Sequence, residues 1–482
     1  MKKLATLLLA AGMVVAASAP ASAADIKVGG FHAFTFETGN TGFTGANDEE
    51  VLQRTRLNLT IAASENLKGF IEFQMGTDNW GDYGTGNKHG RYNVQTRQAY
   101  ADWTIPATNV KVRMGRSCFG LPAEAFGRNS VMDAGWGGRD AIIVTAPVAD
   151  WLNVTAFWNR AATDGTDVDS SNNADMFGLA AALKFNGFAV TPYVAYASID
   201  DGAAAGVGVS QVKDGSFGMA ETKKDDKPTG KYGVTSLSAD SNAYWVGVTA
   251  TLTAFDPFTL KLSAVYGCQE FEGDGVAAAT TPNTLGEDRK GWNVQAKASY
   301  KLGFGTPVLG AWYGSGDDNN EAFGRAGWMP SINGRFAATT DFHDGAWGLG
   351  GGVGTNNIAG TWGVQAGIEG VSFLADLTHD FKVTYIGGTN EEDLFKAVKG
   401  SNDLNPAKLG AYKGPYAYMT TEDSAVEFSL SNTYQIYKNL AANLELAYII
   451  NDFDEDLYTT KDGKKMYDED DWRIGLTFQY NF

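Results

Sequence analysis

The chain has 482 residues and a formal net charge of −18 at pH 7, from 56 acidic and 38 basic side chains. This charge excludes a general role in nucleic-acid binding, because the phosphate backbone attracts cationic proteins and repels acidic ones. The 59 glycines, 27 Phe, 20 Tyr and 12 Trp favour many short strands and Gly-rich loops over long helices. Two cysteines, Cys118 and Cys268, leave open both a single disulfide and two thiols.

Residues 1–23 have the pattern of a secretory signal peptide. Two lysines follow the first Met, residues 4–19 are apolar, and residues 21–23 form a small-x-small cleavage motif. We expect the mature protein, residues 24–482, to be a single transmembrane β-barrel domain. No run of about 18 apolar residues follows the signal, so no transmembrane helix is predicted.

An alternation of apolar and polar residues runs through most of the remaining chain. It predicts 18 antiparallel strands, with 16 as the alternative, at 25–37, 51–63, 67–75, 91–105, 109–116, 139–146, 151–160, 174–185, 188–199, 242–253, 257–271, 290–302, 306–314, 360–369, 371–386, 422–437, 440–451 and 472–482. In the last strand, Phe478, Tyr480 and Phe482 share an apolar face, and the alternate positions are polar. Such a strand needs a nonpolar medium on one face and water on the other. An up-and-down barrel in a membrane provides both.

The predicted connections alternate between short and long. Short turns such as 64–66 and 186–187 are followed, one strand later, by long polar segments such as 200–241 and 315–359. Short turns at one rim and long loops at the other are typical of outer-membrane barrels. A soluble β-sandwich offers no reason for so strict an alternation.

These features together resemble the Gram-negative general porins. The chain has an export signal, hairpins of alternating loop length, and a final strand that ends in Tyr480-Asn481-Phe482. The strand Val110-Lys-Val-Arg-Met-Gly-Arg116 leads into a Gly- and Pro-bearing segment, 117–138, and resembles the porin strand before the inward-folded third loop. The homotrimeric porins of sulfate-reducing, Desulfovibrio-like bacteria are the nearest members that the resemblance suggests.

The resemblance implies a pore constriction between a basic wall and the acids of the third loop. The candidates for the basic wall are Arg54, Arg56, Arg97, Arg113 and Arg116. The acidic candidates are Glu124, Asp133 and Asp140. Opposed charges across a narrow gap would orient polar solutes. The alternatives are that these side chains are solvated lumen residues, or that Arg128 and Arg139 neutralise the loop acids locally.

We therefore expect a water-filled channel for passive diffusion of small hydrophilic solutes and ions, with no cofactor, metal or catalytic residue. A substrate-specific channel for carboxylates or sugars is the alternative, and an outer-membrane enzyme or adhesin is a more distant one. Acidic loops would concentrate cations at the mouth, whereas lumen arginines would favour anions at the waist. From the sequence we expect either a weak selectivity for cations or little ion selectivity.

The expected surroundings follow from the same resemblance. The implied assembly is a homotrimer in outer-membrane lipid and lipopolysaccharide, and Phe478, Tyr480 and Phe482 would form the signal that the barrel-assembly machinery recognises. Acidic runs at 164–169, 452–456 and 468–471 are interpreted as solvated loop acids, with divalent-ion bridging to lipopolysaccharide as the alternative. Tryptophans near strand ends predict interfacial girdles: Trp103, Trp151, Trp158, Trp245, Trp292 and Trp472.

Overall fold

The computed structural model describes residues 25–40, 47–81, 94–134, 138–163, 173–200, 217–224, 227–236, 240–271, 289–316, 327–343, 358–392, 419–454 and 469–482. The strands are β1 (Asp25–Asn40), β2 (Asn47–Ala62), β3 (Leu67–Asn79), β4 (Val94–Thr104), β5 (Lys111–Ser117), β6 (Arg139–Ala149), β7 (Leu152–Thr163), β8 (Asn173–Phe185), β9 (Phe188–Ile199), β10 (Phe217–Lys224), β11 (Lys227–Ser236), β12 (Ser241–Leu252), β13 (Phe258–Phe271), β14 (Arg289–Tyr300), β15 (Thr306–Gly314), β16 (Thr361–Leu374), β17 (Leu377–Gly388), β18 (Ser424–Tyr437), β19 (Leu440–Asp452) and β20 (Asp471–Asn481). Among the described residues no helix is long and apolar enough to cross a membrane.

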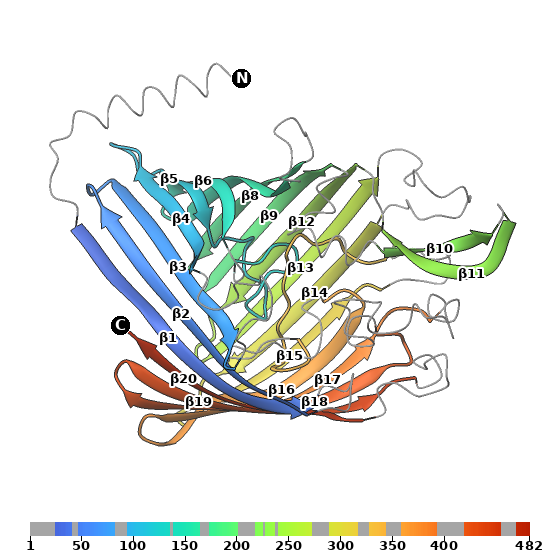
Figure 1. Cartoon of the computed structure of the whole chain (residues 1–482). Coiled ribbons are helices and arrows are strands. Elements are labelled where there is room, and N and C mark those ends of the chain that lie inside the picture. Colours follow the sequence, from blue (N-terminus) through green and yellow to red (C-terminus); the bar gives the residue numbers. More distant parts are fainter. Residues whose placement is uncertain are drawn as a thin grey trace.

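Eighteen of these strands form one closed antiparallel barrel (Figure 1). Each pairs with its neighbours along the chain, β9 pairs with β12, and β1 pairs with β20 to close the ring. At the closing seam the backbones of Gly30 and Phe482 exchange two hydrogen bonds of 3.0 Å each. A Cβ on Gly30 would lie 2.1 Å from the carbonyl oxygen of Arg56. This position therefore requires glycine, because β1 and β2 approach each other closely here.

The barrel confirms the predicted strand number of 18. One boundary was wrong: the turn expected at Gly370 lies instead at 375–376, because Gly370, with φ of 68°, forms an irregularity inside β16 rather than its end. The hairpin β10–β11 was also missed. It lies inside the predicted loop 200–241 and forms a separate two-stranded sheet.

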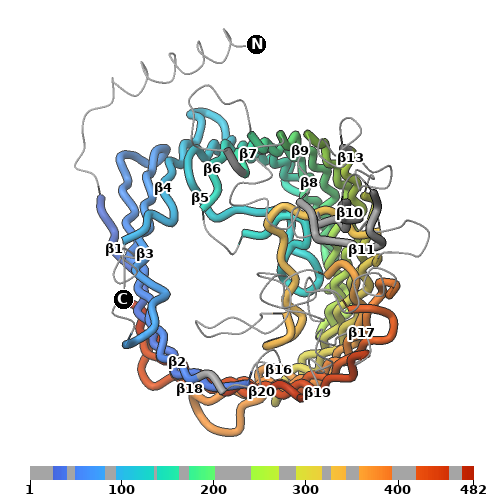
Figure 2. Tube along the Cα trace, turned by 45° about the vertical axis from the view of Figure 1, so that its right-hand side comes forward, coloured from blue at the N-terminus to red at the C-terminus, as the bar shows by residue number. Residues whose placement is uncertain are grey.

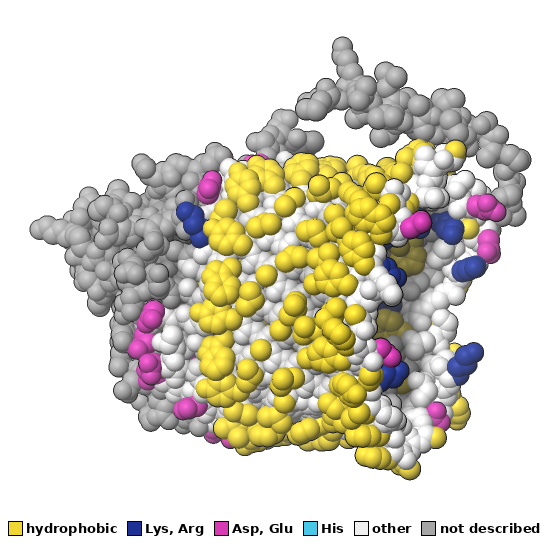
Figure 3. All heavy atoms as spheres, turned by 180° about the vertical axis from the view of Figure 1, so that it is seen from behind, with side chains coloured by type: hydrophobic (Ala, Val, Ile, Leu, Met, Phe, Trp, Pro, Cys, Tyr) yellow, Lys and Arg dark blue, Asp and Glu magenta, His cyan; other side chains and the backbone are white. Residues whose placement is uncertain are grey.

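The outer wall of the barrel carries a broad apolar band (Figure 3). Large apolar side chains on the outward parity of the strands are exposed, as a lipid-facing surface requires. Trp151 and Trp292 belong to this band, with 48% and 42% of their surface exposed. Trp245 does not: it is 2% exposed and its indole N–H donates to the carbonyl oxygen of Pro330 inside the barrel, so its girdle role was wrong.

Two loop segments lie inside the ring of strands (Figure 2). Residues 118–134, between β5 and β6, form the inward-folded third loop that was predicted. Residues 327–343, between β15 and β16, form a second lumen loop that was not. Both pack on inward-facing residues of β7–β9, β12 and β13, where Leu121, Met132 and Ile332 join one buried apolar cluster.

Some sequence predictions lie outside the described residues. They include the signal peptide at 1–23, the acidic run at 164–169 and parts of the two later runs. The two cysteines are described, and their thiols are not joined in a disulfide.

Candidate functional site: the pore lumen

The basic wall is built first from Arg54 and Arg56 on β2. Strand register pairs Arg54 with Ala33, which is 1% exposed, on the face of β1 that points into the barrel. The alternate positions of β2, such as Leu57 and Leu59, face the lipid. Because side chains alternate along a strand, two arginines separated by one residue must share the lumen face.

Both arginines are held by neutral partners. Arg54 donates from Nε to Oγ1 of Thr77 at 2.9 Å, and Arg56 donates from Nε to Oε1 of Gln74 at 2.8 Å. The Arg56 guanidinium also lies 5.3 Å from the centroid of the Phe31 ring. Within the described part of the chain neither arginine forms an ion pair, so both positive charges stay available to a passing solute.

Two other arginines of the predicted basic wall are paired with acids. Arg97 forms an ion pair with Glu72, whose side chain is 8% exposed. Arg113 binds Asp102 through two hydrogen bonds, at 2.7 and 2.8 Å, and stacks 3.9 Å from the Tyr100 centroid. A bidentate Arg–carboxylate pair has fixed geometry and little net charge. Arg113 therefore affects the shape of the lumen more than its electrostatic field.

The prediction that Arg116 and Asp140 line the constriction was wrong. Both lie on the outward parity, which they share with Met114 and Ile142, exposed by 37% and 39%. They pair with each other there, at 2.8 Å. The spacing from Arg113 to Arg116 already carried this signal, because residues three apart in a strand face opposite sides.

The loop acids do not face the pore either. Glu124 is 4% exposed and accepts hydrogen bonds from Ser130 Oγ at 2.6 Å and from the side-chain amide of Gln295 on β14. Burial raises the pKa of Glu124 to about 7, although these hydrogen bonds act to lower it. Asp133 is 5% exposed and lies 3.6 Å from the guanidinium of Arg128. Glu124 holds the third loop to the wall, whereas Asp133 pairs with Arg128 within the loop. The local neutralisation of Asp133 by Arg128 was one of the alternatives.

The two lumen loops are joined to each other along their backbones. The N–H of Ile332 donates to the carbonyl of Val131 at 2.8 Å, and the N–H of Asp133 donates to the carbonyl of Asn333 at 3.1 Å. A Cβ on Gly334 would lie 2.0 Å from the carbonyl oxygen of Ser130, which shows how closely the segments approach. The two loops therefore lie together on one side of the lumen, and β2–β4 lie on the other side (Figure 2).

Sequence reasoning missed the second lumen loop, but a signal was present. Segment 327–343 carries Trp328, Met329, Ile332, Phe336 and Phe342, all at most 3% exposed. So apolar a stretch is unusual in a loop that is expected to face water, because its burial is favourable only against another apolar surface.

A further charged group on the lumen wall was not predicted. Glu369 on β16 lies 3.0 Å from Lys297 on β14 and 3.0 Å from Lys382 on β17. Strand register places Lys261 of β13 opposite Lys297 on the same face. Two lysines contact this carboxylate and a third faces the lumen beside Lys297, so this part of the wall, near the short turns, carries an excess of positive charge.

A sequence model of the Gram-negative porins matches residues 7–321 of the chain. The chain belongs to this family. It is a porin: a water-filled β-barrel channel of the outer membrane that passes small hydrophilic solutes by diffusion. The family and the fold are those of channels rather than enzymes.

The fold of this porin is also that of several solved structures from Pseudomonas aeruginosa. OccK1 (OpdK) superposes with a TM-score of 0.52 at 10% sequence identity, over 95% of this chain and 98% of that one. OccK11 (OpdR) superposes with a TM-score of 0.51 at 10% identity, over 95% and 96%. A structure of OpdK with vanillate has a TM-score of 0.51 at 10% identity, over 95% and 98%. No curated protein sequence matches the porin significantly.

Proposed function

We propose that this porin prefers small hydrophilic anions over cations. The observation that carries the proposal is that Arg54 and Arg56 face the lumen opposite the two loops and are held only by neutral groups. The acids that would have opposed them, Glu124 and Asp133, are buried in the third loop. The field at the waist is therefore positive on one side and close to neutral on the other, which differs from the sequence-based expectation of cation preference or little preference.

The second candidate is a channel with saturable affinity for organic carboxylates. Lys297 and Lys382, which contact Glu369, and Lys261 beside Lys297 favour it, because a solute that leaves the arginines meets a second positive region further along the wall. OpdK, which shares the fold, was solved with vanillate, an aromatic carboxylate. A sugar channel has less support, since Trp245, one of the aromatics that could have guided sugars, is buried under a loop.

Recordings of the purified porin in a planar bilayer distinguish these functions. Stepwise ohmic currents are expected, and a KCl gradient should give a reversal potential of the sign that marks chloride as the more permeant ion. A saturable decrease of current on adding benzoate, with no effect of a neutral sugar of similar size, would establish the carboxylate channel. A reversal potential of cation-selective sign would refute the anion preference.

The assembly and export of the porin remain proposals from its resemblance to trimeric porins of Desulfovibrio-like bacteria. We propose that residues 1–23 direct export, that the mature barrel forms homotrimers, and that lipopolysaccharide surrounds it. The outward-facing Phe478, Tyr480 and Phe482 support a role of the last strand in recognition by the assembly machinery, because all three side chains are open to a partner before lipid covers them. Light scattering of the detergent-solubilised complex tests the trimer.

A further inference from the structure

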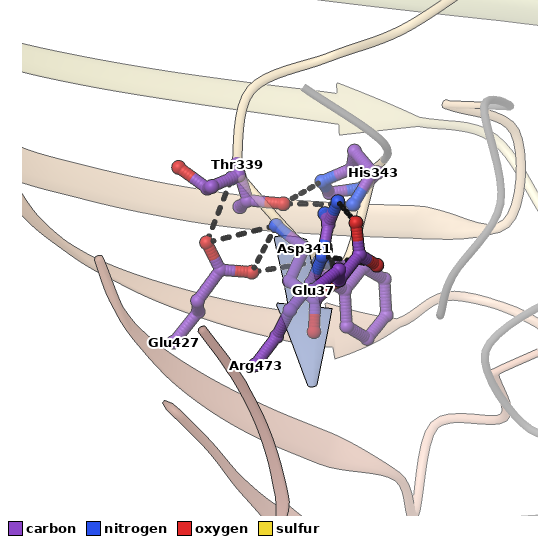
Figure 4. A network of polar contacts seen from close by, with 8 residues as sticks. Glu37, Thr339, Asp341, His343, Glu427 and Arg473 are labelled. Atoms are coloured by element: carbon purple, nitrogen blue, oxygen red, sulfur yellow. Dashed lines mark hydrogen bonds and ion pairs between the residues drawn. The ribbon is translucent and has the colours of Figure 1, made fainter. Parts of the chain in front are cut away.

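Residues 339–343 of the second lumen loop, named the tip here, are bound to the inner wall of β18. Glu427 of β18 is 1% exposed and points at the tip (Figure 4). Its carboxylate accepts backbone N–H groups from Thr340 at 2.7 Å, from Asp341 at 3.2 and 3.3 Å, and from Phe342 at 2.7 Å. Three successive N–H groups that converge on one anion form a nest, and these hydrogen bonds are strengthened by the charge.

The opposite side of the tip meets the seam where the barrel closes. Arg473 of β20 binds Glu37 of β1 through two hydrogen bonds, at 2.8 and 2.7 Å, and its Nη1 lies 3.6 Å from the carboxylate of Asp341 (Figure 4). Arg473 therefore bridges the first strand, the last strand and the loop. Glu445 of β19 lies near enough to add to the field at this guanidinium.

The tip also supports the third loop. The ring of His343 lies 4.8 Å from Phe336 and 5.5 Å from Trp312, and both of these rings contact Phe126 of the third loop, at 5.5 and 5.7 Å. The imidazole is fully buried, and burial lowers its pKa to about 3, so it packs as a neutral ring. A displacement of the tip is thus transmitted to both segments that narrow the pore.

We propose that Glu427 is a positioning residue of the pore constriction. Its carboxylate latches the tip of the second lumen loop to the barrel wall, and Arg473 fixes the tip on its other side. The substrates of the channel do not touch Glu427, which acts only through the place of the loop. The latch sets the width of the pore and keeps it constant in time.

The direction of the effect follows from where the tip lies. Asp341, Phe342 and His343 are each 0% exposed, so the tip is already pressed against the wall. Among the described residues the barrel wall closes off one side of the tip, so a released tip moves towards the lumen. Release therefore obstructs the pore intermittently instead of widening it.

The variant Glu427→Gln tests the latch with almost no change of side-chain volume. An amide offers one acceptor oxygen and turns an N–H₂ donor towards backbone donors, so the nest is lost. Loss of the charge-assisted hydrogen bonds shifts the equilibrium between latched and released tip on the order of a thousandfold towards release. Single-channel recordings should show rapid flicker to lower levels and a smaller mean conductance than wild type.

A matched control lies two residues along the same strand. Ser429 is 6% exposed on the same inward face of β18, and among the described residues none of the tip's hydrogen bonds involves it. Ser429→Ala should conduct as steadily as wild type. Quiet, wild-type currents from Glu427→Gln would overturn the proposal.

Removal of the tip tests whether Glu427 positions the loop or only stabilises the barrel. In a porin whose residues 339–343 are replaced by two glycines, Glu427 has no partner, so adding Glu427→Gln should change neither conductance nor noise. If Glu427→Gln alone fails to assemble, the proposal requires that the tip deletion restore assembly. Flicker or failed assembly that persists without the tip would show that Glu427 acts on the barrel itself, and would refute the latch.

Discussion

Neutralising Arg54 and Arg56 tests the anion preference most directly. An anion about 5 Å from one guanidinium gains about 0.8 kcal/mol in a medium like water, and about 3 kcal/mol at an effective dielectric constant of 20. Even the smaller value corresponds to about a fourfold change in local anion concentration for each charge. The double variant Arg54→Gln, Arg56→Gln should therefore lower the ratio of anion to cation permeability by an order of magnitude or more.

The assay is the reversal potential across a KCl gradient, measured at low and at high salt. Glutamine keeps a hydrogen-bonding group near Thr77 and Gln74, so the pore radius and the single-channel conductance at high salt should change little. The difference from wild type should be largest in dilute salt, because screening weakens with the Debye length.

The matched control is Arg116→Gln. This variant also removes one guanidinium, but from the outer face, where it pairs with Asp140. Its reversal potential should equal that of wild type. The reasoning is refuted if the double variant keeps the wild-type potential, or if Arg116→Gln shifts the potential as much.

Three other outcomes are expected. Glu72→Gln removes the acid that pairs with Arg97 and should raise the anion preference in the same assay; a lower preference would contradict the described pairing. Because the pKa of Glu124 is raised from 4.5 to about 7, its contribution to docking of the third loop is complete below about pH 4.5 and is lost as pH rises through 7, by about 3 kcal/mol in all. Protease cleavage of that loop should therefore increase from about pH 5 to pH 8 in wild type, but not in Glu124→Gln. Deletion of Phe482 should reduce the amount of heat-resistant trimer in the outer membrane, and an unchanged amount would exclude its role in assembly.

Strand positions were predictable because lipid and water impose opposite demands on alternate residues. The alternation in β2 placed Arg54 and Arg56 correctly on the lumen face, since Leu57 and Leu59, on the other parity, had to face lipid. The same rule placed Phe478, Tyr480 and Phe482 on the lipid face. Where apolar and polar residues alternated strictly, a single sequence was enough to predict which face of the strand meets lipid.

The lumen loops could not be predicted in this way. Glu124 and Asp133 looked like pore-facing acids because a loop residue has no alternation that assigns it a side. Whether such a residue faces water or a wall depends on contacts far away in sequence, such as Gln295 for Glu124. Arg116 and Asp140 are a different case. Their positions in the alternating pattern already predicted the outward face, but the family resemblance placed them in the constriction.

The position of Arg473 has a consequence for the order in which the pore is made. Glu37 belongs to the first strand and Arg473 to the last, so their ion pair exists only after the two edges of the sheet have met. Asp341 meets this guanidinium, so the contact on the seam side of the tip gains its partner on the first strand only in a finished barrel. In a ring that is still open at its seam, Glu427 alone would hold the tip, and closure of the barrel completes the support of the constriction.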